Sequence, residues 1–437
     1  MDRRAVLAIT LTLMLTSMLT LAFNIKPVRS EPDTITVPDD YPTIQEAINA
    51  AVSGDTISVR AGTYYEHLTI DRPISLIGED AQTTIIDGDA TIHAVVNVTT
   101  DNVNISGFTI QNKHKGEVGI WLYRSRNCTV VGNNVRNIGG IGIALDYCMD
   151  CVVERNNVSD NNLSGIALYF SKGCTVFNNN VDKNNKFAGI DIYSCGECTI
   201  VGNILNNNEN RGIKVYNSGH CIFKDNNITG SNRNFGIYGS ELSHFVNDID
   251  ISNTINGEPV VYLINEYDCS VNPSTYPAIG YLAVVNSTNI TVENLTLRHN
   301  EEGVLFAYTS NSIIRRVTTS HNEYGIHIVN CDNCTVTENT ATNNIIGIRL
   351  WYSNNNVVTG NTATYNSHGI ILSECRNCVV SGNQEQAVLF WMQWWFWTIV
   401  AAGIIALAGA IYFLKKRKPP KSITPTPPIE SIKTSIE

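Results

Sequence analysis

The sequence predicts an all-β solenoid, a right-handed parallel β-helix built from coils of 22–24 residues, and three observations support it. A glycine followed by an apolar residue recurs at a nearly fixed spacing. Apolar residues then alternate with polar ones, which is typical of short strands. One asparagine recurs in each period, and asparagine tolerates the left-handed conformation that sharp corners between strands need.

The recurring glycines form two series. They are Gly119, Gly142, Gly165, Gly189, Gly212 and Gly236, followed by Gly280, Gly303, Gly325, Gly347 and Gly369. The 44 residues between the two series equal two periods, so the sequence predicts one stack that continues through a divergent stretch at 246–279. No long helical pattern lies between the glycines, which leaves coils of about three short strands that stack at about 4.8 Å.

Two further ladders follow the same period. Nine residues past the glycines lie Cys128, Cys151, Cys174, Cys198, Cys221, Asn289, Ser312, Cys334, Asn356 and Cys378. Fourteen residues past them lie Asn133, Asn156, Asn179, Asn203, Asn226, Asp250, Asn294, Asn339, Asn361 and Asn383. We expect these asparagine amides to point inward and to hydrogen-bond to the same residue one coil away.

Each end of the chain has an element of its own. Arg3 and Arg4 precede an apolar run, the pattern of a secretory leader. The segment 43–52 has apolar residues at helical spacing and is expected to form a short helix that covers the open end of the stack. Trp394–Leu414 is apolar and precedes four basic residues, which predicts a membrane span with a cytoplasmic C-terminus.

These patterns divide the chain into seven parts. They are a leader at 1–30, the N-terminal cap and first coils at 31–110, coils at 111–245, the divergent stretch at 246–279, coils at 280–386, a transmembrane helix at 388–414 and a cytoplasmic tail at 415–437. Of the 30 Lys and Arg and 40 Asp and Glu, 20 and 37 lie between residues 31 and 386. This acidic balance disfavours a nucleic-acid partner, because phosphate needs a basic footprint.

Three segments resemble a known family. Ile35–Glu79, Asn247–Glu266 and Tyr281–Leu297 are similar to segments of archaeal cell-surface β-helix proteins, which are grouped with the NosD-type periplasmic copper-binding β-helix family. More distant members of the same superfamily include pectinesterases and pectate lyases. The resemblance implies a β-helix exposed at the cell surface. It leaves the activity open, because one fold hosts many functions.

The cysteines include four C-x-x-C pairs, which are Cys148–Cys151, Cys195–Cys198, Cys331–Cys334 and Cys375–Cys378. In isolation these pairs suggest zinc or copper ligands. The second cysteine of each pair, however, belongs to the ladder, and serine replaces the first in other coils. We therefore interpret the cysteines as small buried core residues, with metal ligation and disulfides as the alternatives, and expect no cofactor.

The outward face of the strand that follows each glycine carries the candidate binding residues. They are the aromatic residues Trp121, Tyr123, Tyr169, Tyr193 and Tyr216, with Asp146, Asp191 and Lys214 among them. Aromatic rings beside carboxylates suit sugars, whereas cross-strand stacking alone is the structural explanation. As catalytic candidates, Asp146, Asp191 and Lys214 do not form the carboxylate pair that glycoside hydrolysis needs.

The sequence thus favours a membrane-anchored extracellular β-helix that binds carbohydrate or serves as an envelope scaffold or adhesin. A polysaccharide lyase, esterase or hydrolase acting on the same face is the alternative from another class. A metal-handling accessory role is a third, weaker hypothesis. The expected partners are a polysaccharide or cell-surface glycan and the membrane.

Overall fold

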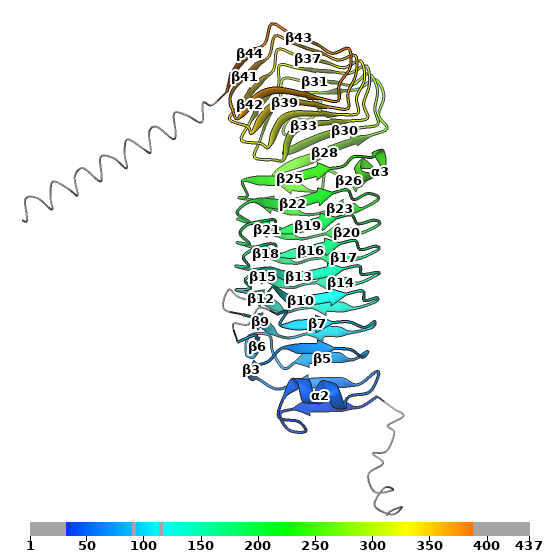
Figure 1. Cartoon of the computed structure of the whole chain (residues 1–437), viewed down its shortest axis with the longest axis vertical. Helices are drawn as coiled ribbons and strands as arrows, with labels where there is room; N and C mark the ends of the chain where they lie inside the picture. The colour runs from blue at the N-terminus through cyan, green and yellow to red at the C-terminus, as the bar shows by residue number, and fades with distance from the viewer. Residues whose placement is uncertain (1–31, 90–92, 113–116, 388–437) are drawn as a thin grey trace, which may run out of the picture. The chain divides into compact units, whose positions relative to one another are not determined.

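The computed structural model describes residues 32–89, 93–112 and 117–387, whose regular structure is almost entirely β-strand (Figure 1). The predicted leader at 1–30, the membrane span at 388–414 and the tail at 415–437 lie outside these residues. Among the residues that are described, no helix is both long and apolar enough to cross a membrane. The predicted parallel β-helix is confirmed, and it consists of two coil stacks rather than one.

Three sheets build the first stack, and nearly all of their strands pair in parallel. Sheet I contains β1 (Thr34–Val37), β2 (Thr56–Val59), β5 (Ser75–Gly78), β8 (Asn104–Ser106), β11 (Thr129–Val131), β14 (Val152–Glu154), β17 (Thr175–Phe177), β20 (Thr199–Val201), β23 (Ile222–Lys224) and β26 (Asp248–Ile249). Sheet II contains β4 (Leu68–Ile70), β7 (Val96–Val98), β10 (Val118–Tyr123), β13 (Ile141–Asp146), β16 (Ile166–Tyr169), β19 (Ile190–Tyr193), β22 (Arg211–Tyr216) and β25 (Arg233–Tyr238). The first-stack part of sheet III contains β3 (Gly62–Tyr65), β6 (Thr84–Asp87), β9 (Thr109–Gln111), β12 (Asn134–Arg136), β15 (Asn157–Ser159), β18 (Asn180–Asp182), β21 (Ile204–Asn206), β24 (Asn227–Thr229) and β27 (Thr254–Ile255).

Three sheets also build the second stack. Sheet III continues into it through β28 (Glu258–Ile264), β30 (Tyr281–Val285), β33 (Glu302–Ala307), β36 (Tyr324–Val329), β39 (Ile346–Trp351) and β42 (His368–Ser373). Sheet IV contains β29 (Ser270–Val271), β31 (Thr291–Glu293), β34 (Ile313–Arg315), β37 (Thr335–Thr337), β40 (Val357–Thr359) and β43 (Val379–Ser381). Sheet V contains β32 (Thr296–Arg298), β35 (Thr318–Ser320), β38 (Thr340–Thr342), β41 (Thr362–Asn366) and β44 (Gln384–Ala387).

A hairpin separates the two stacks. Asn256 and Gly257 both have positive φ, at 52° and 84°, and β27 pairs antiparallel with β28 across them. Asn-Gly is a favoured pair for such a two-residue turn because both residues tolerate this backbone conformation. The predicted continuous stack is therefore wrong: the first glycine series lies in or beside the strands of sheet II, whereas the second lies in or beside the strands of sheet III.

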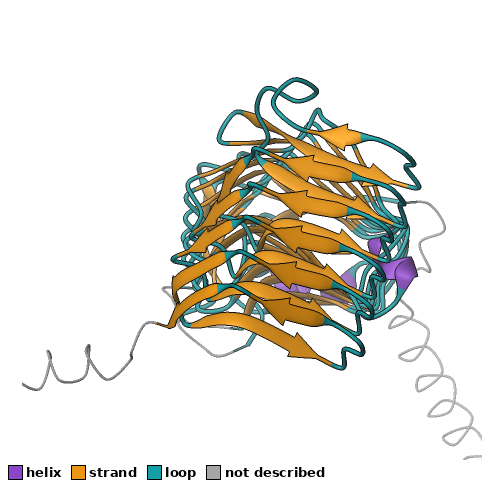
Figure 2. Cartoon of the chain, turned by 90° about the horizontal axis from the view of Figure 1, so that it is seen from above, coloured by secondary structure: helices purple, strands orange, loops and turns teal. Residues whose placement is uncertain are grey.

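The second stack covers the open end of the first (Figure 2). Side chains alternate along β28, β30 and β33, so one set faces the interior of the second stack and the other faces the first stack. Tyr262, Ala283 and Leu305 belong to the core of the first stack. Val261 and Leu282, next to them in sequence, belong to the core of the second. Residues on the outer face of one β-helix thus complete the core of the other.

The strand pairing also corrects the predicted ladders. Gly236 pairs with Lys214, and Asn234 occupies the position expected for the glycine, because this coil is shorter than the glycine spacing suggests. Asn253, rather than Asp250, continues the inward asparagine ladder after Asn226. In the coil that begins near Gly280, Leu282 pairs with Val304, so Tyr281 rather than Gly280 occupies the position that Gly303 holds in the next coil. Positions counted from Gly280 therefore fall one residue before the inward ladder, and Asn289 and Asn294 lie at corners with positive φ, where Asn294 is exposed.

Two other predictions are confirmed. Helix α2 (Ile44–Ala50) begins after Thr43, whose hydroxyl accepts a hydrogen bond from the Glu46 backbone N–H, and it buries Ile44, Ala47 and Ile48 against the first coils. The inward asparagines of the first stack form a continuous hydrogen-bonded ladder. A second short helix, α3 (Leu242–Phe245), lies between β25 and β26.

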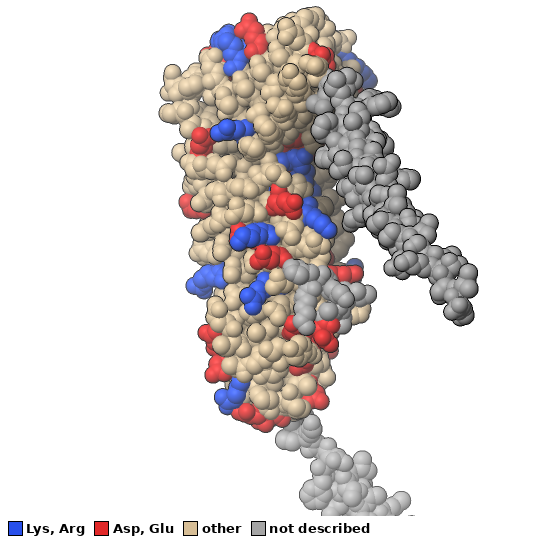
Figure 3. Space-filling view, turned by 90° about the vertical axis from the view of Figure 1, so that its left-hand side faces the viewer, with Lys and Arg blue, Asp and Glu red and all other residues tan. Residues whose placement is uncertain are grey.

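Charged side chains of both signs lie on the surface of the coils. Figure 3 shows Lys and Arg interspersed with Asp and Glu on one side of the described residues. The exposed pair Lys172–Glu197, with 3.0 Å between Nζ and Oε1, is typical of the surface ion pairs. Such pairs contribute little to stability, and a mixed surface favours solubility over recognition of one charged ligand.

Candidate functional site

The predicted aromatic residues lie on the outer face of sheet II. In the pairing register Trp121 stands beside Ala144 and Ala167, and Tyr123 precedes Asp146, Tyr169, Tyr193 and Tyr216 along one row. Tyr193 and Tyr216 stack with ring centroids 5.2 Å apart and an interplanar angle of 1°. Tyr169 meets Tyr193 edge-on at 6.3 Å. Asp146 interrupts the row between Tyr123 and Tyr169, as the sequence indicates.

Two further rings join the parts of this row. Tyr147 and Phe170 stack with centroids 4.9 Å apart, and they link Tyr123, at 6.4 Å from Tyr147, to Tyr193, at 5.4 Å from Phe170. Tyr216 continues to Tyr238 at 6.1 Å. All these separations suit attractive ring contacts. We refer to this chain of rings as the aromatic strip, which consists of Trp121, Tyr123, Tyr147, Phe170, Tyr193, Tyr216 and Tyr238.

Sequence reasoning missed three members of the aromatic strip. Tyr147 and Phe170 follow the strand by one residue and occupy corners with φ of 54° and 51°. The repeat contained their signal, since aromatic residues occur at the same position in two successive coils. Tyr238 lies two residues past Gly236, so an alignment on the glycines assigns it to the position of Trp121, whereas the strand pairing places it beside Tyr216.

The acidic candidates lie beside the strip, and each has its own hydrogen-bond donor. The Trp121 indole donates to Asp146, with 2.9 Å between Nε1 and Oδ2. The Tyr169 hydroxyl donates to Asp191 at 3.0 Å, and the Lys214 Nζ lies 3.8 Å from the other oxygen of Asp191. Burial raises the pKa of both carboxyl groups, although these donors oppose the rise.

This arrangement is suited to binding. The Asp146 and Asp191 carboxylates are held by separate donors, and each helps to fix the orientation of a neighbouring ring. Lys214 also lies over the Phe187 ring, with 4.8 Å between its Nζ and the ring centroid. The result is an aromatic surface flanked by fixed polar groups, which can stack on sugar rings and hydrogen-bond to their hydroxyls.

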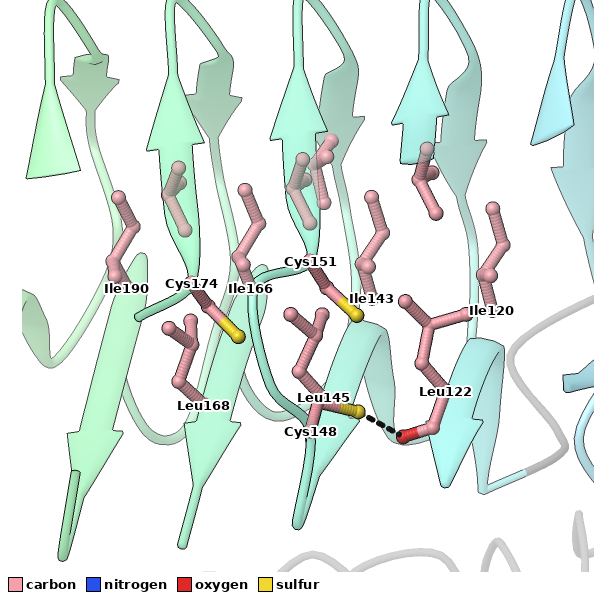
Figure 4. Close-up of a cluster of buried hydrophobic side chains, with 14 of the residues drawn as sticks. Ile120, Leu122, Ile143, Leu145, Cys148, Cys151, Ile166, Leu168, Cys174 and Ile190 are labelled. Carbon is pink, nitrogen blue, oxygen red and sulfur yellow. Dashed lines mark hydrogen bonds between the residues drawn. The ribbon is translucent and has the colours of Figure 1, made fainter. Parts of the chain in front are cut away.

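The cysteines occupy the coil interiors. All twelve are free thiols, and Cys148, Cys151, Cys195, Cys198, Cys331 and Cys334 are buried, whereas Cys375 and Cys378 in the last coil are partly exposed. Figure 4 shows Cys148, Cys151 and Cys174 among isoleucine and leucine side chains, with the Cys148 thiol donating to the Leu122 carbonyl at 3.2 Å. Contact with the Cys151 thiol and burial raise the pKa of Cys128 and Cys148.

We expect the Cys174 thiol to resist alkylation in the native protein and the Cys378 thiol to react, because only the latter is accessible. Replacing Cys174 with serine should lower the free energy of unfolding by only about 1 kcal/mol. At the same position of another coil, the Ser312 hydroxyl donates to the Ser310 carbonyl at 2.7 Å, so a hydroxyl can find a partner there.

Mass spectrometry after iodoacetamide treatment, with and without urea, together with urea unfolding of the Cys174→Ser variant, checks this prediction. Rapid labelling of Cys174 in the folded protein would contradict the buried position. A loss of several kcal/mol in the serine variant would show that the thiol has a role that a hydroxyl cannot fill.

A second polar cluster lies where the two stacks meet. The Arg211 guanidinium forms two hydrogen bonds with the Glu301 carboxylate, at 2.7 and 3.0 Å. Arg233 and Glu323 form another ion pair, with 2.7 Å between Nη2 and Oε2. No sequence signal joins these residues, because about 90 positions separate the members of each pair and different coils supply them.

Buried polar groups lie beneath these ion pairs. The Tyr281 hydroxyl donates to Glu302 at 2.9 Å, and the His327 ring lies against Tyr324 with centroids 4.5 Å apart. Burial and the repulsion from Glu301 raise the pKa of Glu302 well above its ordinary value. Burial and the Arg349 charge lower the pKa of His327 to about 3. Both shifts favour the uncharged form of the group.

The fold defines the class: this is a parallel β-helix protein whose first coil stack carries a continuous aromatic strip on one face. The chain belongs to the NosD family, since the family model described as "Periplasmic copper-binding protein (NosD)" matches residues 48–261 and 246–387. The predicted resemblance to the NosD-type β-helix family is thereby confirmed. No curated protein sequence matches the chain.

Several solved structures share the fold at low sequence identity. The A-module of the mannuronan C-5 epimerase AlgE4 from Azotobacter vinelandii is 15% identical with a TM-score of 0.38, covering 79% of this chain and 92% of its own. The α-1,3-glucanase from Streptomyces thermodiastaticus is 15% identical with a TM-score of 0.44, covering 80% and 68%. The Dettilon tailspike protein is 12% identical with a TM-score of 0.44, covering 80% and 68%. These likenesses concern the β-helix fold alone.

The family description raises the question of a copper ion. Within 32–89, 93–112 and 117–387, no group of three or more His, Cys, Asp or Glu side chains is arranged to hold a metal ion. The thiols of Cys148 and Cys151 each donate to a backbone carbonyl instead, at 3.2 and 3.4 Å. Copper ligation by cysteine needs thiolates, which this apolar interior disfavours. The described side chains do not fit a copper ion.

Proposed function

We propose that this protein is an exported, membrane-tethered β-helix whose aromatic strip binds a polysaccharide. The observation that carries the proposal is the continuity of the strip, whose rings contact one another from Trp121 to Tyr238 along successive coils. Coils repeat at about 4.8 Å, so the strip presents a row of ring faces to an extended ligand. Rings of this kind pack on the C–H faces of sugars, and neighbouring polar groups bind hydroxyls.

The backbone at two corners supports a role in binding over a role in sheet stability. Tyr147 and Phe170 adopt left-handed conformations, which are unfavourable for bulky residues, and they remain 52% and 47% exposed. The same position holds Ser194 and Asn217 in the next two coils. A large ring that is strained and exposed contributes little to its own fold, so its presence favours contact with a ligand.

The sequence supports an extracellular location for the two coil stacks. The basic residues and apolar run before residue 24 fit an export signal, and the apolar segment at 388–414 followed by basic residues fits a single membrane span. In this arrangement the two coil stacks lie outside the cell and residues 415–437 lie inside. The aromatic strip then faces the medium or the cell envelope, where polysaccharides occur.

Replacing both Tyr147 and Phe170 with serine, the residue that the next coil carries, should weaken binding of the recognised polysaccharide at least about tenfold. Each ring contact contributes about 1 kcal/mol, so two lost rings lower the affinity by more than one order of magnitude. Binding of the full-length protein to a polysaccharide array, with affinities measured by titration of the positive polysaccharides, provides the measurement.

The matched control is Tyr365→Asn. Tyr365 is also an exposed aromatic residue at positive φ, but it lies in sheet V of the second stack, and Asn343 holds its position one coil earlier. The control should bind normally. Equal binding by the strip variant and the wild type would contradict the proposal. Release of shortened or modified sugars, scored in the same assay, would instead establish the enzymatic alternative.

A further inference from the structure

The aromatic strip does not end with the first stack. Tyr238 contacts Tyr324 of the second stack, with ring centroids 5.6 Å apart, and lies 5.7 Å from His327. His327 pairs with Arg349 on the neighbouring strand, in a row on the outer face of sheet III that starts at Ala283 and Leu305. Ala283, Leu305 and His327 are buried, whereas Arg349 is only half-buried. Along this row, Arg349 is thus the first side chain that reaches the surface, and it lies beside the end of the aromatic strip.

The Arg349 guanidinium is held in place by rings. It lies over the Tyr324 ring and the Trp351 ring, with 5.1 and 5.3 Å from its central carbon to the two centroids. Its Nη1 donates to the Tyr324 hydroxyl at 2.9 Å. In the part of the chain that the structure describes, no carboxylate oxygen lies within 4.0 Å of this guanidinium. Stacking fixes the plane of the group and leaves its remaining N–H donors for another partner.

The charges at the junction do not balance. Glu301 is bound by Arg211, and Glu323 lies 2.7 Å from Arg233 and 3.8 Å from Arg211. These two carboxylates neutralise two guanidinium groups. Burial raises the pKa of Glu302 and lowers that of His327, which favours the uncharged form of both groups. Of the three guanidinium groups, that of Arg349 is the one without a carboxylate at ion-pair distance among the described residues.

We infer that Arg349 binds the carboxylate or sulfate group of a sugar unit, and that the ligand of the aromatic strip is therefore an acidic polysaccharide. This inference rests on the proposed function of the strip. A guanidinium matches a carboxylate or sulfate through two parallel hydrogen bonds, which lysine or an amide cannot reproduce. The strip supplies ring faces for the uncharged faces of the sugars, and Arg349 supplies the anion contact at its end.

Two pairs of polysaccharides test the inference with the full-length protein. Polygalacturonate carries a carboxylate where its methyl ester carries a neutral ester group, and dextran sulfate carries sulfate groups that dextran lacks. We expect the wild type to prefer one charged member over its neutral partner, and the charged member that is preferred identifies the anion. Arg349→Gln should weaken binding of that member about tenfold or more and leave the neutral partner unchanged. Arg349→Lys should restore only part of the loss, because the forked geometry is absent.

Arg376→Gln provides the control, since Arg376 is exposed on the last coil of the same stack. It should bind like the wild type. Equal affinity of the wild type for charged and neutral partners, or an unchanged affinity in Arg349→Gln, would overturn the inference. If either of these results is found but the Tyr147→Ser/Phe170→Ser variant loses binding, the proposed polysaccharide binding is retained and only the preference for an acidic polysaccharide is refuted. Unchanged binding in the strip variant would overturn both.

Discussion

Replacing Asn179 with alanine should lower the free energy of unfolding by about 3 kcal/mol. The side-chain amide of Asn179 donates to the Val153 carbonyl at 2.9 Å and to the Asn203 side-chain oxygen at 3.0 Å. Its own oxygen accepts from the backbone and side-chain nitrogens of Asn156, at 2.9 and 3.0 Å. Alanine would leave the Asn156 backbone N–H and the Val153 carbonyl buried without these partners. Each buried polar group that loses its hydrogen bond lowers the free energy of unfolding by about 1–3 kcal/mol.

Asn180→Ala is the matched control for this prediction. Asn180 is the next residue, but its side chain points outward and bonds only to the exposed Asn157 side chain, at 3.2 Å. It should change stability by less than about 0.5 kcal/mol. Urea unfolding followed by circular dichroism, with hydrogen exchange to locate the affected coils, compares the two variants. Equal stability of the two would show that the inward ladder does not hold the coils together.

Replacing Arg211 with alanine should destabilise the protein by about 3 kcal/mol and separate the unfolding of the two stacks. The side chains of Arg211 and Glu301 are 17% and 6% exposed, so removal of the cation leaves a carboxylate that is buried and uncompensated. This pair joins β22 of the first stack to the start of β33 in the second. Its loss therefore weakens the contact through which unfolding of one stack is coupled to the other.

Two further variants separate charge from packing. Arg211→Ala combined with Glu301→Gln should recover part of the lost stability, because no unpaired carboxylate remains. Arg60→Ala removes the exposed pair with Asp39, whose side chains are 56% and 51% exposed, and should have almost no effect. Calorimetry is expected to show one transition in the wild type and two in Arg211→Ala. A single, unshifted transition would contradict the coupling role of this pair.

Local periodicity accounts for what could be predicted of the fold. The alternation of apolar residues assigns each side chain to the inside or the outside of its own coil, and the asparagines mark the inward corners. These signals need only residues that are close in sequence, which is why the three-strand coil, the ladder around Asn179 and the helix that begins after Thr43 agree with the structure. Most of the candidate site follows in the same way, because Tyr193 and Tyr216 occupy one outward position in successive coils.

The periodicity of the sequence does not show which other part of the chain packs against the outward face of a strand. Leu305 and His327 fit the outward pattern of their strands, yet both are buried, because the Asn256–Gly257 hairpin turns the second stack across the end of the first. That turn also brings Tyr238 to Tyr324 and Arg211 to Glu301. The sequence by itself determined the coil and the position of the aromatic strip. Only the tertiary structure decided what packs against the end of the first stack and which cation lies at the end of the strip, because these depend on contacts between residues about 90 positions apart.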